Sequence, residues 1–305
     1  LQKNGIIQAR KQFLAALKYA VEELDVKIVL LAASTKRLFG KNGEEKVNED
    51  GKSDANGFSL SELYPNVLFT NGDNGTSVIL NMEIDSVLEK AGITTSNDEE
   101  FTENCKTTSS SGVVVVNGLG LLGLDSLEYL IEKKLNDNQI IVISNYTKDL
   151  KQLVGNRNIP IFPHIQEIKK NGQLECLNQI RAIINCTHNP TNIIDYNTIK
   201  HIQNGQALYV IDVAVPYGFP EEEYLKCDNV FRQDGGNAYI EEGLEFFFNP
   251  EICGLTEKVF YGCFAEAMSL SIFMKEKPEN REYLNQFDYF NVNKTTKQSV
   301  KNLFN

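Results

Sequence analysis

No run of eighteen or more apolar residues occurs in this 305-residue chain, so the sequence predicts no membrane-spanning helix. The N-terminus also lacks the succession of basic, apolar and small residues that marks a secretion signal. Only three histidines are present, His164, His188 and His201, and their spacing is not that of metal ligands. We therefore expect a cytoplasmic protein with no stable membrane insertion and no bound metal.

Paired cysteines and excess positive charge are also lacking. The six cysteines form no Cys-x-x-Cys motif in a chain too large to need disulfide bonds, which favours free thiols over disulfides or zinc. Lys and Arg total 30 against 41 Asp and Glu, which gives a formal net charge of −11. That charge excludes nucleic acid and anionic membrane surfaces as general partners.

The chain does contain enough apolar sequence, 42% of all residues, for one large or two ordinary domains. Apolar residues at intervals of three and four predict helices over residues 8–23 and 77–90. Residues 41–58 have almost no apolar side chains and predict a mobile surface loop, while the Asn- and Gly-rich residues 71–76 predict a turn. We assign residues 1–98 to a mainly helical substrate domain.

A different pattern begins at Gly112, after a polar stretch over residues 99–111 that is typical of a linker. The wholly apolar, β-branched run over residues 113–116 is typical of a strand buried on both faces of a parallel sheet. Strand-like runs then recur, with helical stretches between the first of them. The strand-like runs occupy 140–144, 159–162, 182–185, 207–215 and 229–231, and the helical stretches 121–134 and 147–153. We predict an α/β fold, with a Rossmann-like, doubly wound nucleotide-binding domain over residues 112–253.

A glycine-rich loop joins the first of these strands to the helix that follows it. Its residues are Gly118, Leu119, Gly120, Leu121, Leu122 and Gly123. The G-x-G-x-x-G spacing permits a tight turn at the first glycine, approach of a pyrophosphate at the second, and close helix packing at the third. The helix N-terminus adds amide donors and a positive dipole. The alternative is a glycine-rich turn without a ligand, but the flanking strand and helix favour dinucleotide binding.

The end of the second strand indicates which dinucleotide binds. An acidic residue there would bind the ribose hydroxyls of NAD. The sequence instead has Ser144, Asn145, Thr147 and Lys148, which could contact a 2′-phosphate, so it favours NADPH. The alternative is that these residues simply begin the next helix. We add Thr187, which follows the strand-like run over 182–185, to the predicted cofactor site.

Residues 260–268 read Phe-Tyr-Gly-Cys-Phe-Ala-Glu-Ala-Met. This segment resembles the cysteine motif of the aldehyde-forming long-chain acyl-[acyl carrier protein] reductases of the cyanobacterial type. Asp-Gly-Gly at 234–236, Thr-x-Gly-x-x-x-Thr at 70–76 and the glycine loop follow in that family's order, so the resemblance runs thinly over nearly the whole chain. It implies that Cys263 is the acyl-accepting nucleophile in the NADPH-dependent reduction of a fatty acyl thioester to a fatty aldehyde.

The sequence also departs from the family pattern. The segment over residues 70–76 lacks a His that is usual in the family, and the end of the second strand lacks the family's Arg. The glycine loop also differs in detail, and residues 41–58 resemble an insertion. Family members begin with a further substrate-domain segment. Because this chain opens on Leu1, we expect that upstream sequence is missing.

Cys263 has a structural and a chemical interpretation. A free cysteine on an apolar helix usually packs in the core, and only the family resemblance favours the nucleophile. A thiolate attacks a thioester readily, and a helix N-terminus or a nearby cation would help it form. Glu266, one turn further on, would raise the pKa of the thiol if it were close and ionised, and we give it no other role. We expect Cys263 on a helix within residues 254–305, which return to the substrate domain.

An acyl carrier protein is implied as the acyl donor by the resemblance alone. Carrier helices are usually acidic, so the net charge of −11 opposes docking unless Arg10, Lys11, Lys36 and Arg37 form a local basic face. Acyl coenzyme A is the alternative donor. Two other functions remain open: a dehydrogenase of a small hydroxy or keto compound that uses no cysteine, and a non-catalytic acyl or nucleotide sensor.

Overall fold

The computed structural model divides the chain into two compact units. One unit, called here the terminal unit, comprises residues 1–78 and 237–305, and the other, the sheet unit, comprises residues 79–236. Within them the structure describes residues 3–32, 35–36, 38–40, 43–93, 112–145, 150, 154–170, 179–187, 189–203, 205–243, 256–277 and 279–304. The linker predicted over 99–111 lies outside the described residues, as does all but one residue of the helix predicted over 147–153.

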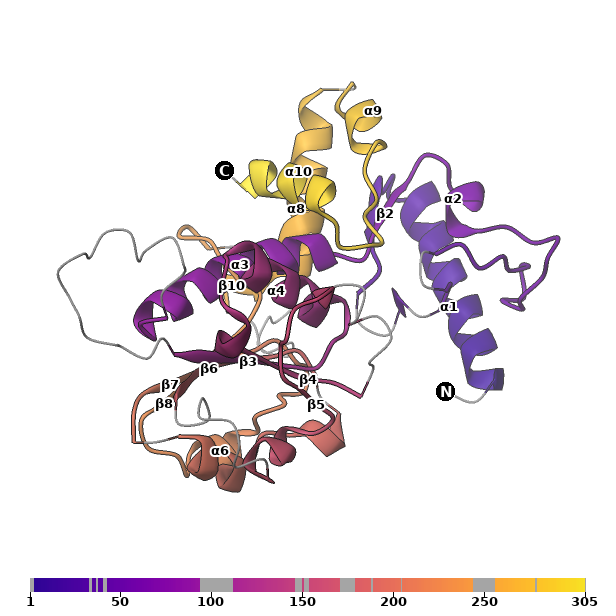
Figure 1. Ribbon diagram of the computed structural model, residues 1–305. Helices are drawn as coiled ribbons and strands as arrows, with labels where there is room; N and C mark the ends of the chain where they lie inside the picture. Colours follow the sequence, from indigo (N-terminus) through magenta and orange to yellow (C-terminus); the bar gives the residue numbers. More distant parts are fainter. Residues whose placement is uncertain are drawn as a thin grey trace. The chain divides into compact units, whose positions relative to one another are not determined.

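The sheet unit contains six parallel strands in the order β5-β4-β3-β6-β7-β8 (Figure 1). The strands are β3 (Val113–Asn117), β4 (Ile140–Ile143), β5 (Ile161–Phe162), β6 (Ile180–Asn185), β7 (Leu208–Asp212) and β8 (Val230–Asp234). The chain builds outward from β3 to β5, returns to the centre, and builds outward again from β6 to β8. This is the doubly wound, Rossmann-like order, with its switch point between β3 and β6. The predicted fold class is confirmed.

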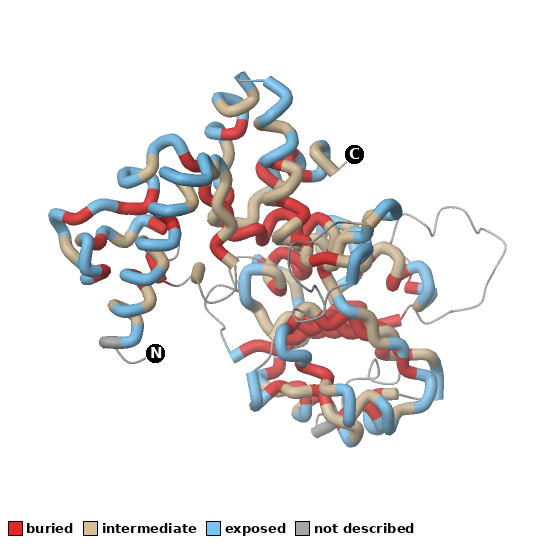
Figure 2. Tube along the Cα trace, turned by 180° about the vertical axis from the view of Figure 1, so that it is seen from behind, coloured by how far each residue is buried: buried red, intermediate tan, exposed pale blue. Residues whose placement is uncertain are grey.

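Helices cover both faces of this sheet, which explains the continuous apolar runs in its strands. Val114 and Val116 pack with α4 (Leu121–Glu132) on one face, and Val113 and Val115 pack with α6 (Tyr196–Ile202) on the other. The central strands β3, β4, β6 and β7 are accordingly buried over nearly all of their length (Figure 2), whereas the edge strands β5 and β8 are partly exposed. The shorter helical elements of this unit are α7 (Glu221–Tyr224) and the 3₁₀ turns at Asp137–Gln139, Ile165–Lys170 and Pro190–Asn192.

Helix α3 (Asp73–Lys90) begins in the terminal unit and continues into the sheet unit. Its residues Leu80, Ile84 and Val87 lie in the same apolar cluster as Val114, so α3 from residue 79 onward belongs to the sheet unit. The bounds expected for the nucleotide-binding domain, 112–253, stay a prediction. The helix also starts four residues earlier than predicted, inside the expected turn. Asn71 explains the early start, because its Oδ1 accepts the backbone N–H of Asp73 at 3.0 Å.

The terminal unit combines helices with two small sheets. Its helices are α1 (Lys3–Glu22), α2 (Leu60–Leu63), α8 (Gly262–Glu276), α9 (Asn280–Leu284) and α10 (Lys294–Phe304). Strand β1 (Ile28–Leu30) pairs in parallel with β2 (Leu68–Thr70), and β9 (Asn237–Tyr239) pairs in antiparallel fashion with β10 (Val259–Tyr261). The prediction of a helix from residue 254 is wrong at β10, whose β-branched and aromatic side chains favour a strand.

The segment predicted to be a mobile surface loop packs against α1 over its described residues 43–58. Val47 is 2% exposed and bridges to Ser53 and Phe58. Arg10, buried in α1, forms an ion pair with Glu45 at 2.6 Å and donates to Ser53 Oγ at 2.9 Å. One buried apolar residue and a buried arginine therefore hold residues 43–58 against α1. The polar composition of this segment had predicted a mobile surface loop instead. No helix among the described residues is both long and apolar enough to cross a membrane.

Candidate functional site

The glycine loop leaves β3 and forms the start of α4. Gly118 has φ +89°, and a Cβ there would lie 2.5 Å from Thr187 Cβ. A Cβ at Gly123 would lie 1.9 Å from the Gly118 carbonyl oxygen, whereas one at Gly120, the N-cap of α4, would meet nothing within 4 Å. The first glycine thus permits the turn, the third permits close packing, and the second leaves open space at a helix N-terminus. These features fit the pyrophosphate of a dinucleotide.

The other predicted cofactor residues have different surroundings. Thr187 lies against Gly118, so the structure brings these two segments together. Leu119 and Leu122 are partly buried against the core cluster that contains Val116, and Leu121 is 38% exposed. At the end of β4, Ser144 is buried and its backbone N–H donates to Phe162 O at 2.8 Å, while Asn145 is exposed. Thr147 and Lys148 lie outside the described residues, so the choice of NADPH over NAD stays a prediction.

A buried polar network at the carboxyl ends of the central strands was missed from the sequence. Asn117, Asn185 and Asp212 end β3, β6 and β7 and lie in register with one another. Asn117 Nδ2 donates to Asn185 Oδ1 at 2.7 Å, and Asn185 Nδ2 donates to Asp212 Oδ1 at 2.8 Å. Asp212 Oδ2 accepts the backbone N–H of Phe219 at 2.7 Å. The signal was present, because a single amide or carboxylate closes each apolar strand.

This network lies at the edge where open α/β sheets bind their ligands. The Asn117 side chain precedes the glycine loop directly, and its Oδ1 is buried with no hydrogen-bond partner within the part of the chain that the structure describes. Its Nδ2 also donates to Asn192 O at 3.0 Å. The three linked side chains therefore hold the ends of the central strands beside the predicted pyrophosphate site.

In the terminal unit, Cys263 is the second residue of α8, directly after β10. The segment over residues 70–75, called here the glycine turn, runs from the end of β2 into the first turn of α3 and lies against this helix start. A Cβ at Gly72 would lie 2.2 Å from Cys263 Cβ, and one at Gly75 would lie 2.6 Å from the carbonyl oxygen of Gly262. Two segments of the family resemblance that are about 190 residues apart in the sequence therefore meet at the cysteine.

Opposing influences act on the Cys263 thiol. Burial is the largest and raises its pKa to about 11, and the charges of Asp73 and Glu266 act in the same direction. Lys36 and a hydrogen bond from the backbone amide of Phe264 lower the pKa. The nearby cation and the helix N-terminus that would help a thiolate form are thus both present. Burial nevertheless has the larger effect on the pKa of the thiol. The thiol is therefore protonated at neutral pH.

Glu266 lies one turn further along α8 and is fully buried. Its Oε1 accepts the Thr70 hydroxyl, and its Oε2 accepts the backbone N–H of Gly75 at 2.5 Å. Burial raises the pKa of this carboxyl to about 7, although both hydrogen bonds lower it. Sequence reasoning gave Glu266 only a possible influence on the thiol, and the structure adds that it ties the glycine turn to α8.

Three of the four residues that could have formed a local basic face are paired with carboxylates. Arg10 is buried and paired with Glu45, Lys11 pairs with Asp50 at 3.4 Å, and Lys36 pairs with Asp73. Each of these cations is therefore neutralised by a carboxylate of the same unit. Arg37 lies outside the described residues.

The described cysteines are free thiols, as predicted for them. Cys186 follows β6, and burial raises its pKa to about 12. Cys227 Sγ donates to the carbonyl oxygen of Glu223 at 3.4 Å, and burial raises its pKa as well. The other three cysteines lie outside the described residues. Among the described residues, no group of three or more His, Cys, Asp or Glu could hold a metal ion.

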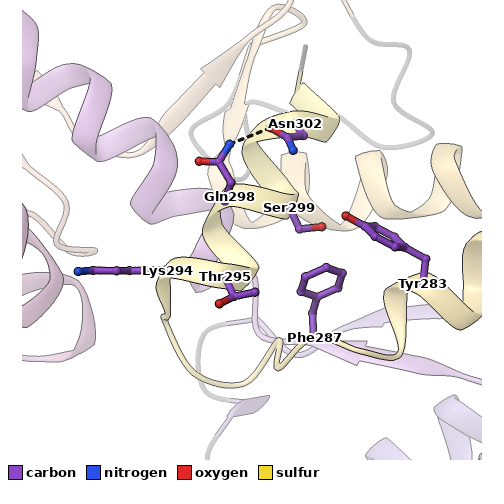
Figure 3. Close-up of a pocket in the computed structure, with 7 residues that line it drawn as sticks. All are labelled: Tyr283, Phe287, Lys294, Thr295, Gln298, Ser299 and Asn302. Carbon is purple, nitrogen blue, oxygen red and sulfur yellow. Dashed lines mark hydrogen bonds between the residues drawn. The ribbon is translucent and has the colours of Figure 1, made fainter.

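A pocket of about 500 Å³ lies on the C-terminal helices of the terminal unit (Figure 3). It does not include Cys263. Its lining combines one aromatic ring of α9 and one from the segment before α10 with polar side chains of α10. The lining residues are Tyr283, Phe287, Lys294, Thr295, Gln298, Ser299 and Asn302.

Comparison with known proteins adds little to this description. No protein-family model matches the chain, and no curated protein matches it. Among solved structures, a dipicolinate synthase subunit from Bacillus halodurans matches 55% of this chain with 14% identity and a TM-score of 0.35. The matched region spans 51% of that protein, about half its length. The Rossmann-like assignment rests on the strand order and the glycine loop of this chain itself.

Proposed function

We propose that this protein reduces long-chain fatty acyl thioesters to fatty aldehydes with NADPH, and that Cys263 carries the acyl group. The observation that carries the proposal is the meeting of the glycine turn with Cys263 at the start of α8. Gly72 lets the backbone of the glycine turn pack directly against Cys263, and Gly262 has no side chain beside the thiol. The Rossmann-like sheet and its glycine loop support a dinucleotide as the source of reducing equivalents.

The reaction begins when the Cys263 sulfur, freed of its proton, attacks the thioester carbonyl and expels the thiol of the donor. The backbone amides at the start of α8 favour the negative charge that develops there. NADPH, when bound at the glycine loop and the N-terminus of α4, supplies a hydride. Reduction of the acyl-Cys263 thioester gives a hemithioacetal, which collapses to the aldehyde and releases the Cys263 sulfur, and the proton consumed overall comes from solvent.

The acyl donor is a carrier protein or coenzyme A, since both present the same thioester. Pairing of Arg10, Lys11 and Lys36 with carboxylates removes three cations from the face that an acidic carrier would need. A comparison of palmitoyl-carrier protein with palmitoyl-coenzyme A at increasing salt distinguishes the two donors. Binding of a carrier protein through opposite charges would weaken as salt is added.

Acyl transfer is tested by intact-mass measurement after incubation with palmitoyl-coenzyme A and, separately, with palmitoyl-carrier protein. Wild type should gain one palmitoyl group, and Cys263→Ala should gain none. Cys227→Ala is the matched control, because it removes another described free thiol and should be acylated like wild type. If wild type gains no acyl mass from either donor, the proposal is wrong.

The elevated pKa of Cys263 favours a second candidate, a dehydrogenase of a small hydroxy or keto compound in which the thiol only packs. Such an enzyme would use the sheet unit in the same way but would not need the sulfur. Alkylation of Cys263 separates the two functions. It should abolish thioester reduction, whereas a dehydrogenase that does not use the cysteine would keep its turnover.

A further inference from the structure

Glu266 is a fully buried carboxyl group that accepts hydrogen bonds from two neutral donors, the Thr70 hydroxyl and the Gly75 amide. Buried carboxylates are usually paired with Lys or Arg, because an ion removed from water without a partner is costly. Lys36 acts on Glu266 electrostatically but forms its ion pair with Asp73. A carboxyl group that is buried without a Lys or Arg partner is a candidate for a role in catalysis.

Glu266 and Cys263 share one face of α8, because side chains three residues apart on a helix are neighbours. Both also contact the glycine turn, Cys263 at Gly72 and Glu266 at Gly75. Thr70 links these contacts, since its Oγ1 accepts the Gly72 N–H at 2.9 Å while its hydroxyl donates to Glu266. The carboxyl group and the thiol are thus enclosed by the same short segment.

Among the described residues of the terminal unit, Lys36 and Asp73 act on the pKa values of this pair, and the charge of Glu266 acts on a third group, Tyr289. Lys36 and Asp73 neutralise each other in their ion pair. Tyr289 is neutral at physiological pH, because burial raises its pKa and the charge of Glu266 adds to the effect. The remaining negative charge can reside on Glu266 or on Cys263, and an ionised Glu266 raises the pKa of the thiol. Transfer of one proton from sulfur to carboxylate keeps the charge of the enclosed region constant.

We propose that Glu266 accepts the thiol proton of Cys263 as the sulfur attacks the acyl donor, and that the departing thiol then recovers this proton. The S–H bond breaks as the S–C bond to the acyl carbon forms, and the donor's C–S bond breaks as its sulfur becomes protonated. Glu266 returns to the carboxylate at the end of the transfer. This role rests on the proposed function, since it requires acylation of Cys263. A pKa of about 7 suits a group that must both take and give a proton near neutrality.

The first test compares two reactions of Cys263 in the full chain. Alkylation by iodoacetamide needs only the thiolate, whereas acylation by palmitoyl-coenzyme A also uses the proton acceptor. In Glu266→Gln the like charge is gone, so alkylation at a fixed pH should be faster, by about tenfold for each unit by which the thiol pKa falls. Acylation should be slower by about a hundredfold or more, because the base is gone.

Two variants separate this role from a structural one. Glu276→Gln, at the exposed end of α8, removes a carboxylate from the same helix and should leave both rates as in wild type. Thr70→Val removes a hydrogen bond to Glu266 but keeps its carboxylate, so acylation should remain within about tenfold of wild type. If Glu266→Gln slows alkylation and acylation alike, Glu266 only holds the glycine turn, and the proposal is overturned.

Wild type alone provides a second test that does not depend on the folding of a variant. Acylation should rise with pH through about 7, as Glu266 ionises, while alkylation should continue to rise towards pH 11 with the thiolate. Identical pH profiles for the two reactions would overturn the role of Glu266 while leaving acyl transfer intact. Absence of any acyl-enzyme in wild type would instead overturn the proposed function, and this role with it.

Discussion

Replacement of Gly72 with alanine tests the contact between the glycine turn and Cys263. The new Cβ would lie 2.2 Å from Cys263 Cβ and 2.5 Å from its Cα, so the two backbones must move apart. Gly72 also has φ +73°, a left-handed conformation that costs a non-glycine residue about 1–2 kcal/mol. Overpacking adds about 1–3 kcal/mol. We therefore expect Gly72→Ala to lower the free energy of unfolding by about 2–5 kcal/mol.

Gly40→Ala is the matched control, because Gly40 lies in the same unit with φ +75° and its Cβ would make only ordinary contacts, with Glu45 Cβ at 3.4 Å and Glu45 N at 3.6 Å. This variant has the backbone strain without the steric clash, so its free energy of unfolding should fall by only about 1–2 kcal/mol. The assay is urea denaturation followed by tyrosine fluorescence, since the chain has no tryptophan. Alkylation of Cys263 should also change in Gly72→Ala alone. Equal losses of stability and unchanged alkylation in both variants would refute the contact.

Three further predictions concern both units. Gly120→Ala should keep wild-type stability, because its Cβ would meet nothing within 4 Å. It should nevertheless weaken NADPH binding by about tenfold or more, as measured by calorimetric titration, because the new methyl group occupies the space for the pyrophosphate. Asn185→Ala should lower the free energy of unfolding, measured by urea denaturation, by about 2–4 kcal/mol, because it removes three hydrogen bonds, with Asn117, Asp212 and the carbonyl oxygen of Thr187. Lys36→Met should slow alkylation of Cys263 at every pH below the pKa of the thiol, because loss of the cation raises that pKa.

Features that depend on local sequence were predictable. The central strands of the sheet unit are short apolar runs buried on both faces, and all six strands were located to within a few residues. The glycine loop was predictable because its three glycines have separate steric roles at fixed spacing. Asn117, Asn185 and Asp212 were missed, although each ends an apolar strand, because their pairing becomes visible only when the strand order is known.

Features that depend on distant contacts were not predictable. The burial of Val47 depends on Arg10 of α1, which holds the 43–58 segment through Glu45 and Ser53. The glycine turn and α8 meet across about 190 residues of sequence, so neither the enclosure of Cys263 nor the hydrogen bonds to Glu266 follow from spacing along the chain. The pKa values of both groups are set mainly by burial, which is a property of the folded unit.

The most direct measurement of the central claim is a chase of the acyl-enzyme. Wild type is loaded with a palmitoyl thioester, freed of excess donor, and mixed with NADPH while intact mass and aldehyde are followed together. If Cys263 carries the acyl group, the palmitoyl mass on it should disappear at the rate at which palmitaldehyde forms, with one NADPH oxidised for each aldehyde. An acyl-enzyme that persists in NADPH, or one that loses its acyl group only as free fatty acid, would contradict this prediction.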